Sequence, residues 1–144
     1  MKHATGQDFE AVRSLFRQHR QWFPHIRNSH IKRSIEAGET IFDKGVVINY
    51  HIYKRKTKIG DVYAYPGDCI LHQIAASERN GTARVVLNDF FELMSRRVFL
   101  SVRADNDIAI KFYHNMGMKH VGDTSWGKYD GLVFLKDHDP WTIT

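Results

Sequence analysis

Residues 69–96 read CILHQIAASERNGTARVVLNDFFELMSR, and the rest of the chain is organised around this stretch. The apolar run 69–76 predicts a short buried strand. After it, apolar residues recur three and four positions apart, which predicts a helix with one apolar face: Ala83, Val86, Leu87, Phe90, Phe91 and Met94. The turn between them, Ser77 to Ala83, contains Gly81 and leads straight into the helix. Because the first amides of a helix lack intrahelical partners and lie at the positive end of its dipole, we predict that this turn holds the pyrophosphate of a nucleotide cofactor.

Length and composition predict one ordinary globular domain spanning residues 1–144. Hydrophobic residues make up 42% of the chain and charged residues 26%. No apolar run approaches the length of a membrane span, and the N-terminus lacks the apolar core of a signal peptide. The single cysteine, Cys69, excludes an internal disulfide and fits a reducing compartment. We therefore expect a cytoplasmic protein with no membrane partner.

The charge balance favours phosphate-bearing or acidic partners, because the formal net charge is +5. The nine histidines are scattered and show no metal-ligand spacing, so no metal is expected.

The first half of the chain predicts an edge strand, two helices and a β-hairpin. The edge strand covers residues 2–5, the helices cover residues 8–20 and 28–37, and the hairpin strands cover residues 40–42 and 46–53. Between the helices lies a corner rich in aromatic residues, histidine and arginine. This corner is either a solvated helix–helix connection or the lip of an acceptor-substrate pocket, and the sequence leaves both open.

A basic run, residues 54–58, follows the hairpin and is typical of a solvated loop tip, with a nucleic-acid contact as the alternative. Residues 60–67 then lead into the central strand. After the central helix the sequence predicts a buried strand over residues 98–103 and a helix capped by residues 104–106 and ended by Gly117. Two further strands, 118–121 and 132–136, are predicted with a long connection over residues 122–131. This alternation of strands and helices predicts an α/β sheet with a parallel portion.

Residues 100–122, LSVRADNDIAIKFYHNMGMKHVG, resemble a signature of the GNAT superfamily of acyl-CoA-dependent N-acetyltransferases. The signature is a strand, then Asn-x-x-Ala-x-x-Phe-Tyr, then a Gly before the next strand. It matches Asn106, Ala109, Phe112, Tyr113 and Gly117. The turn after the central strand is similar to the acyl-CoA loop of the family, Gln/Arg-x-x-Gly-x-Gly/Ala. Gly81 and Ala83 fall on its small positions, Glu78 stands where Gln or Arg is usual, and the loop is shorter than is common.

This resemblance implies an α/β fold (α+β in some schemes) consisting of a single GNAT-like domain. Its central sheet would be mixed and twisted, with about six to seven strands, helices on both faces and a splay at the acyl-CoA site. The implied activity is transfer of an acetyl (acyl) group from acetyl-CoA to a primary amine by direct attack, with Tyr113 as the general acid. His72 is the best substitute for the general base that many relatives carry on the central strand, and Glu78 is a second candidate.

The resemblance also implies a set of acyl-CoA contacts. Backbone groups of three strand residues would pair with the pantetheine arm, the amides of the turn would hold the pyrophosphate, and two arginines would add charge. Asn106 would hydrogen-bond near the pantetheine. The complete set is Ile74, Ala75, Ala76, Arg79, Asn80, Gly81, Thr82, Ala83, Arg84 and Asn106.

Each of these residues has a plainer interpretation. Gly81 could serve only a tight turn, Asn106 only a helix cap, and Tyr113 only the core. For the whole chain, two alternatives stay open: a GNAT-like protein that binds or modifies nucleic acid, and a non-catalytic acyl-CoA-binding module. The acceptor, a small molecule or a protein, and assembly into a homodimer also stay open.

Overall fold

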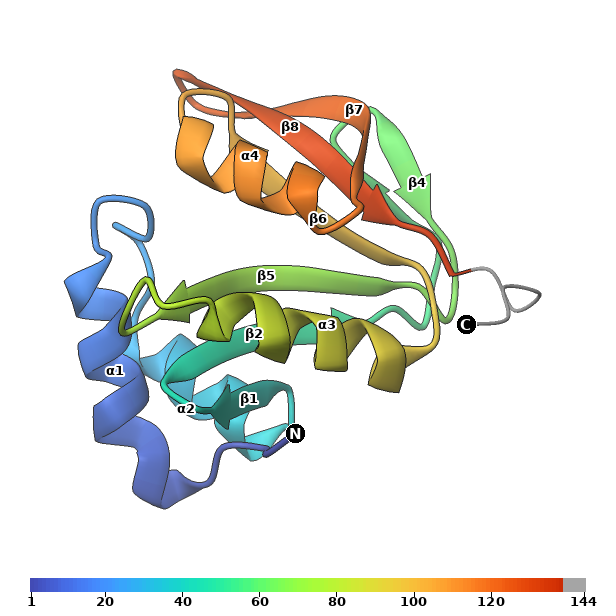
Figure 1. Ribbon diagram of the computed structural model, residues 1–144. Helices are drawn as coiled ribbons and strands as arrows, with labels where there is room; N and C mark the ends of the chain where they lie inside the picture. Colours follow the sequence, from blue (N-terminus) through green and yellow to red (C-terminus); the bar gives the residue numbers. More distant parts are fainter. Residues whose placement is uncertain (139–144) are drawn as a thin grey trace. The chain divides into compact units, whose positions relative to one another are not determined.

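The structure of the protein, a computed structural model, describes residues 1–138; the last six residues of the predicted domain, 139–144, lie outside the described residues. Figure 1 labels most of the helices and strands, which are numbered in chain order. The elements are η1 (Gly6–Asp8), α1 (Phe9–Gln18), α2 (Asn28–Glu36), β1 (Thr40–Asp43), β2 (Val46–Ile52), β3 (Thr57–Ile59), β4 (Val62–Ala64), β5 (Cys69–Ala76), α3 (Thr82–Met94), β6 (Val98–Arg103), α4 (Asp107–Asn115), β7 (Lys119–Trp126) and β8 (Tyr129–Lys136).

The described strands form a mixed sheet of six strands and a separate two-stranded hairpin. The sheet has the hydrogen-bonded order β1-β2-β5-β6-β8-β7, and β3 pairs with β4. β5 and β6 are parallel, with Cys69, Ile70 and Leu71 opposite Val98, Phe99 and Leu100. The pairs β1–β2, β6–β8 and β7–β8 are antiparallel. The predicted fold class, a mixed sheet with helices, is therefore confirmed.

The chain divides into two compact parts. The first part comprises Met1–Tyr50 and His72–Phe90, and the second comprises His51–Leu71 and the residues from Phe91 onward. β5 and α3 each contribute residues to both parts. Each part is described by itself below.

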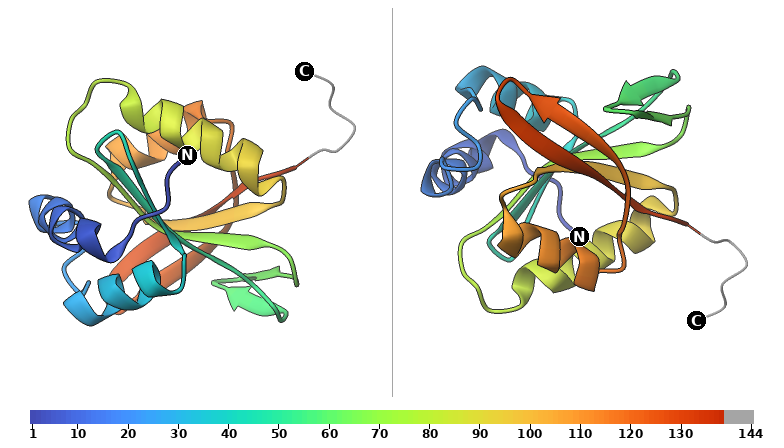
Figure 2. Two further views of the ribbon diagram at one scale, coloured as in Figure 1. Left: turned by 90° about the horizontal axis from the view of Figure 1, so that it is seen from below. Right: turned by 90° about the horizontal axis from the view of Figure 1, so that it is seen from above.

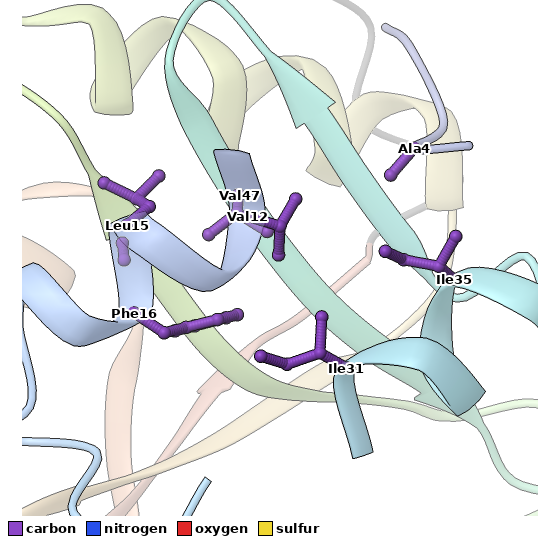
Figure 3. Packing of buried hydrophobic residues seen from close by; sticks show 8 residues of the cluster. Ala4, Val12, Leu15, Phe16, Ile31, Ile35 and Val47 are labelled. Atoms are coloured by element: carbon purple, nitrogen blue, oxygen red, sulfur yellow. The ribbon is translucent and has the colours of Figure 1, made fainter. Parts of the chain in front are cut away.

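In the first part, helices cover both faces of the strands. The apolar stripe of α1 packs with α2 and with Val47 of β2, as Figure 3 shows, and Ala75 of β5 belongs to the same cluster. Successive residues of a strand point to opposite faces, so Tyr50 lies on the other face from Val47. There its ring meets Phe90 of α3 edge-on, with 5.3 Å between the ring centroids. The strand pattern of β2, which is buried from Val46 to Tyr50, follows from this double cover.

In the second part, α4 and the β3–β4 hairpin cover opposite faces of β8. The Tyr113 ring of α4 lies 6.4 Å from the Phe134 ring, whereas the neighbouring Val133 packs with Ile59 and Ala64 of the hairpin. Figure 1 shows β4 of the hairpin next to β7, and Figure 2 gives two further views of the ribbon. The Asp61 amide donates to the Asp123 carbonyl oxygen (3.0 Å). Gly60 permits this approach, because a Cβ at its position would collide with that carbonyl oxygen.

The prediction for the last two strands was wrong in its boundaries. β7 runs to Trp126 and β8 begins at Tyr129, so the long connection predicted over residues 122–131 is a turn of two residues, Gly127 and Lys128. Gly127 has a positive φ of 56°, which suits a tight turn. β7 lies at the edge of the sheet, and most of its side chains are exposed. Its sequence therefore lacks the apolar alternation from which a strand is predicted.

Two shorter segments also differ from prediction. The basic run, residues 54–58, was expected to form a solvated loop tip, but β3 begins within it at Thr57. Residues 60–67 contain β4. The edge strand predicted over residues 2–5 is reduced to one bridge between His3 and Ile41. Among the described residues, no helix combines the length and apolar character needed to cross a membrane.

Candidate active site

The end of β5 carries four of the predicted site residues in the first part of the chain. Ala75 is buried in the core cluster with Phe16 and Val47, and Ile74 and Ala76 are half-buried. His72 is exposed. β5 ends where predicted, at Ala76, and the turn begins at Ser77.

Helix α1 supports this strand end through its last residues. His19 Nε2 lies 2.8 Å from the Ala76 carbonyl oxygen. Because a carbonyl only accepts, Nε2 must carry the hydrogen and donate it. Gln18 Nε2 donates to the Ser77 carbonyl oxygen (3.3 Å), and the Ser77 amide donates to the Gly45 carbonyl oxygen (2.9 Å). The sequence gives no signal for these contacts, since the contacts of α1 join residues 57 and 59 positions apart and Ser77 is 32 positions from Gly45.

The turn after β5 has the glycine conformation that the sequence predicts. Gly81 has φ +85°, a left-handed conformation that side-chain-bearing residues rarely adopt. The Val85 amide donates to the Gly81 carbonyl oxygen (3.4 Å), so α3 starts directly after it. Arg79 and Arg84 are exposed on either side of this start. The turn therefore presents backbone amides and two cations at a helix N-terminus.

Asn80 already occupies one of these amides. Its Oδ1 accepts a hydrogen bond from the Thr82 amide (3.1 Å) and a second one from the Thr82 hydroxyl. Its Nδ2 donates to Glu78 Oε2 (3.1 Å). A phosphate that needs the Thr82 amide must therefore displace the Asn80 side chain. The sequence did not reveal that Asn80 occupies this amide.

In the second part, α4 carries Asn106 and Tyr113 nearly two turns apart. Asn106 is the N-cap, as predicted: its Oδ1 accepts from the Ala109 amide (3.2 Å). Because this bond uses the side-chain oxygen, the Nδ2 hydrogens remain as donors for a ligand. The helix ends before Gly117, whose φ of +85° ends it as predicted.

The Tyr113 phenol lies in an apolar environment. The residue is 8% exposed. The Phe112 ring lies 5.6 Å away and the Phe134 ring 6.4 Å away, centroid to centroid. This burial raises the pKa of the Tyr113 phenol far above its ordinary value. Tyr113 therefore stays protonated throughout the neutral pH range.

The first part thus brings together the end of β5, the turn and the start of α3, and the second part brings together Asn106 and Tyr113. Within residues 1–138, no group of three or more His, Cys, Asp or Glu side chains has the arrangement of a metal site.

Comparison with known proteins gives structural matches alone. No family model matches the sequence, and no curated protein matches it. Ard1 from Thermoplasma volcanium has a TM-score of 0.76 at 16% identity, with 95% of each chain covered. An acetyltransferase of the GNAT family from Bacillus cereus has a TM-score of 0.68 at 17% identity, with 95% of each chain covered. Arabidopsis thaliana NAA60, solved with acetyl-CoA, has a TM-score of 0.67 at 17% identity; the match covers 94% of this chain and 97% of that one. Similarity at this level of identity establishes the fold.

Proposed function

We propose that this chain, which has the fold of the GNAT N-acetyltransferases, transfers an acetyl group from acetyl-CoA to a primary amine. The observation that carries the proposal is Tyr113, a buried and protonated phenol on a helix that Asn106 caps. A protonated phenol can donate a hydrogen bond and a proton to a departing thiolate.

The proposed reaction is a direct attack of the amine nitrogen on the thioester carbonyl carbon. The tetrahedral intermediate collapses, the carbon–sulfur bond breaks, and the electron pair leaves with the sulfur of CoA. Tyr113 donates a hydrogen bond to this sulfur and then its proton. Because burial raises the pKa of the Tyr113 phenol, the phenol carries its proton at neutral pH and can donate it to the sulfur.

The proposed cofactor contacts use the backbone first. Backbone groups of Ile74, Ala75 and Ala76 pair with the pantetheine arm in the manner of a strand. The Ala76 carbonyl keeps one lone pair for this role, because His19 uses the other. The amides of residues 79–83 hold the pyrophosphate once Asn80 releases Thr82, and Arg79 and Arg84 add charge.

The proposed general base is His72. Its imidazole is exposed on β5, where it can exchange a proton with the attacking amine directly or through water. Glu78, the second candidate, is already engaged by the Asn80 side chain in the turn. Asn106 is proposed to donate from Nδ2 to the pantetheine arm.

The test is release of free CoA thiol from acetyl-CoA in the presence of a panel of primary amines. With an accepted amine, Tyr113→Phe should lower kcat by about 10²- to 10⁴-fold, the usual contribution of a general acid, with little change in acetyl-CoA affinity. Tyr63→Phe is the matched control, because Tyr63 is an exposed tyrosine of β4, and it should leave kcat unchanged.

Two results would contradict the proposal, one for the activity and one for the role of Tyr113. Saturable acetyl-CoA binding without thiol release for any amine would indicate a non-catalytic acyl-CoA-binding module. Turnover that survives Tyr113→Phe would remove Tyr113 as the acid.

A further inference from the structure

A cavity lies between α1, the loop after it and α2, entirely within the first part of the chain. Its volume is about 470 Å³, which is in the range of small-molecule sites. Three apolar side chains and three arginines dominate its lining: Phe16, Phe23, Ile31, Arg13, Arg17 and Arg20. The cavity therefore combines an apolar interior with a cationic side.

The apolar side chains of the cavity lining pack against one another. Phe16 is 1% exposed and belongs to the core cluster with Ile31. The Phe23 ring meets the Phe16 ring edge-on, with 5.5 Å between the centroids and 86° between the planes. Phe16 and Phe23 suit a ring-sized apolar group, because aromatic side chains favour edge contacts with further rings.

Arg13 and Arg17, four positions apart, lie on one face of α1, and Arg20 follows in the turn after the helix. Arg13 is held in place: its Nε donates to Asn28 Oδ1 of α2 (3.2 Å) and its Nη1 donates to Glu10 Oε2 (3.1 Å). Arg17 and Arg20 are exposed, and within residues 1–138 no ion pair joins either of them to a carboxylate. Two uncompensated guanidinium groups thus flank the cavity.

The segment that builds the cavity carries an excess of positive charge. Residues 11–35 contain six arginine and lysine residues and no aspartate or glutamate. The chain has 21 basic and 16 acidic residues in total, so the remainder carries 15 basic and 16 acidic residues. The net charge of +5 therefore comes from the segment that builds the cavity. Such an asymmetry favours an anionic ligand.

We propose that this cavity binds an organic anion, a carboxylate or phosphate on an apolar, ring-sized body. The oxyanion pairs with Arg17 and Arg20 while the apolar body rests on Phe16 and Phe23. Arg13 lines the same side but is largely committed to Glu10 and Asn28, so it contributes positive potential more than a direct bond.

The position of the cavity suggests what this anion is, and this step rests on the proposed function. Phe16 shares a core cluster with Ala75 of β5, and His19, at the end of α1, is bonded to the Ala76 carbonyl. The cavity therefore adjoins the strand end that we propose to hold pantetheine. An amine acceptor that also carries an oxyanion fits both requirements.

A small anion fits the cavity better than nucleic acid does. A nucleic-acid surface spreads its cations along the path of the backbone phosphates. Here the three arginines line a single cavity together with apolar side chains. Lys32, in contrast, lies over the Phe9 ring at 5.1 Å and takes no part in the cavity.

The test is isothermal titration of the full chain with phenyl phosphate and with benzoate at low salt. Both should bind saturably. Benzyl alcohol has the ring without the charge, and inorganic phosphate has the charge without the ring. Each of these two controls should bind at least tenfold more weakly. The double variant Arg17→Ala/Arg20→Ala should weaken phenyl phosphate binding by at least tenfold. The control Arg27→Ala/Arg33→Ala removes the same charge outside the cavity lining and should weaken it less than twofold.

Several results would overturn the proposal. These are absence of saturable binding of both aromatic anions, equal losses in the two double variants, and inorganic phosphate binding as tightly as phenyl phosphate. Tighter binding of a ten-nucleotide single-stranded DNA, with a steep salt dependence that both double variants reduce, would assign the region to nucleic acid instead.

Titration of acetyl-CoA in parallel separates this proposal from the proposed function. Arg17→Ala/Arg20→Ala should retain acetyl-CoA binding, since neither arginine belongs to the proposed cofactor contacts. If acetyl-CoA fails to bind the wild-type chain while the phenyl phosphate results hold, the acetyltransferase proposal fails and the anion site stands. If acetyl-CoA binds while phenyl phosphate does not, the anion site is disproved and the acetyltransferase proposal stands.

Discussion

Replacing Tyr113 by phenylalanine should change how the stability of the protein depends on alkaline pH. Burial raises the pKa of the Tyr113 phenol in the folded chain above its ordinary value of 10.0, while the unfolded chain keeps a value near 10. Above about pH 10 the unfolded chain therefore releases this proton and the folded chain retains it, so the free energy of unfolding falls as pH rises. Below about pH 10 the contribution is fully present. At pH 11 the wild-type protein should have lost about 1.4 kcal/mol through this one group.

Urea unfolding followed by circular dichroism, from about pH 8 to about pH 11, measures this effect. The difference in free energy of unfolding between wild type and Tyr113→Phe should stay constant up to about pH 9. It should then shift in favour of the variant by about 1.4 kcal/mol at pH 11. Tyr53, whose pKa burial also raises, is present in both proteins and cancels in the difference. A difference that does not change with pH would refute the reasoning, because Tyr113 would then ionise equally in both states.

Three further variants and one control test the packing of α1, the β3–β4 hairpin and the turn after β5. Phe16→Ala should lower the free energy of unfolding by about 3–5 kcal/mol in urea, because the ring is 1% exposed; a loss below about 1 kcal/mol would contradict the packing of α1. Gly60→Ala should cost at least about 2 kcal/mol, because φ is +59° and the new Cβ would collide with a backbone carbonyl. Gly6→Ala, where the Cβ meets nothing within 4 Å, should cost less than about 0.5 kcal/mol, and equal losses would disprove the steric argument. Asn80→Ala should lower stability by about 1 kcal/mol, yet tighten acetyl-CoA binding up to about tenfold by freeing the Thr82 amide; weaker binding would show that Asn80 supports the cofactor.

The central elements of the fold follow from the sequence. The strands Cys69–Ala76 and Val98–Arg103 match their predicted bounds, because both are apolar runs bounded by polar residues. The cap at Asn106 is also confirmed. These features are local, so a single sequence suffices to predict them.

The edge of the sheet and the small hairpin do not follow from the sequence. β7 is mostly exposed, so it lacks the apolar alternation that marks a half-buried strand. β3 and β4 have three residues each, which is too short for any periodicity to be recognised. The hairpin that they form contacts β7 through Asp61 and Asp123, which are far apart in the chain.

The candidate site was predictable in its residue types and not in its contacts. The sequence indicates the left-handed Gly81, because only glycine adopts that conformation readily. It does not indicate that Asn80 occupies the Thr82 amide or that His19 supports Ala76. Nor does it reveal that Arg13 is held by Asn28 beside a cavity, since that contact exists only once α1 and α2 pack together.

Isothermal titration of acetyl-CoA into the wild-type chain tests the central claim most directly. Saturable binding of one acetyl-CoA per chain is expected, and Gly81→Val should weaken it at least tenfold, because the left-handed turn that presents the amides would be strained. Gly6→Ala, far from any packed neighbour, should leave the affinity unchanged. Absence of binding at millimolar acetyl-CoA, or an affinity that Gly81→Val does not alter, would contradict the proposed cofactor site.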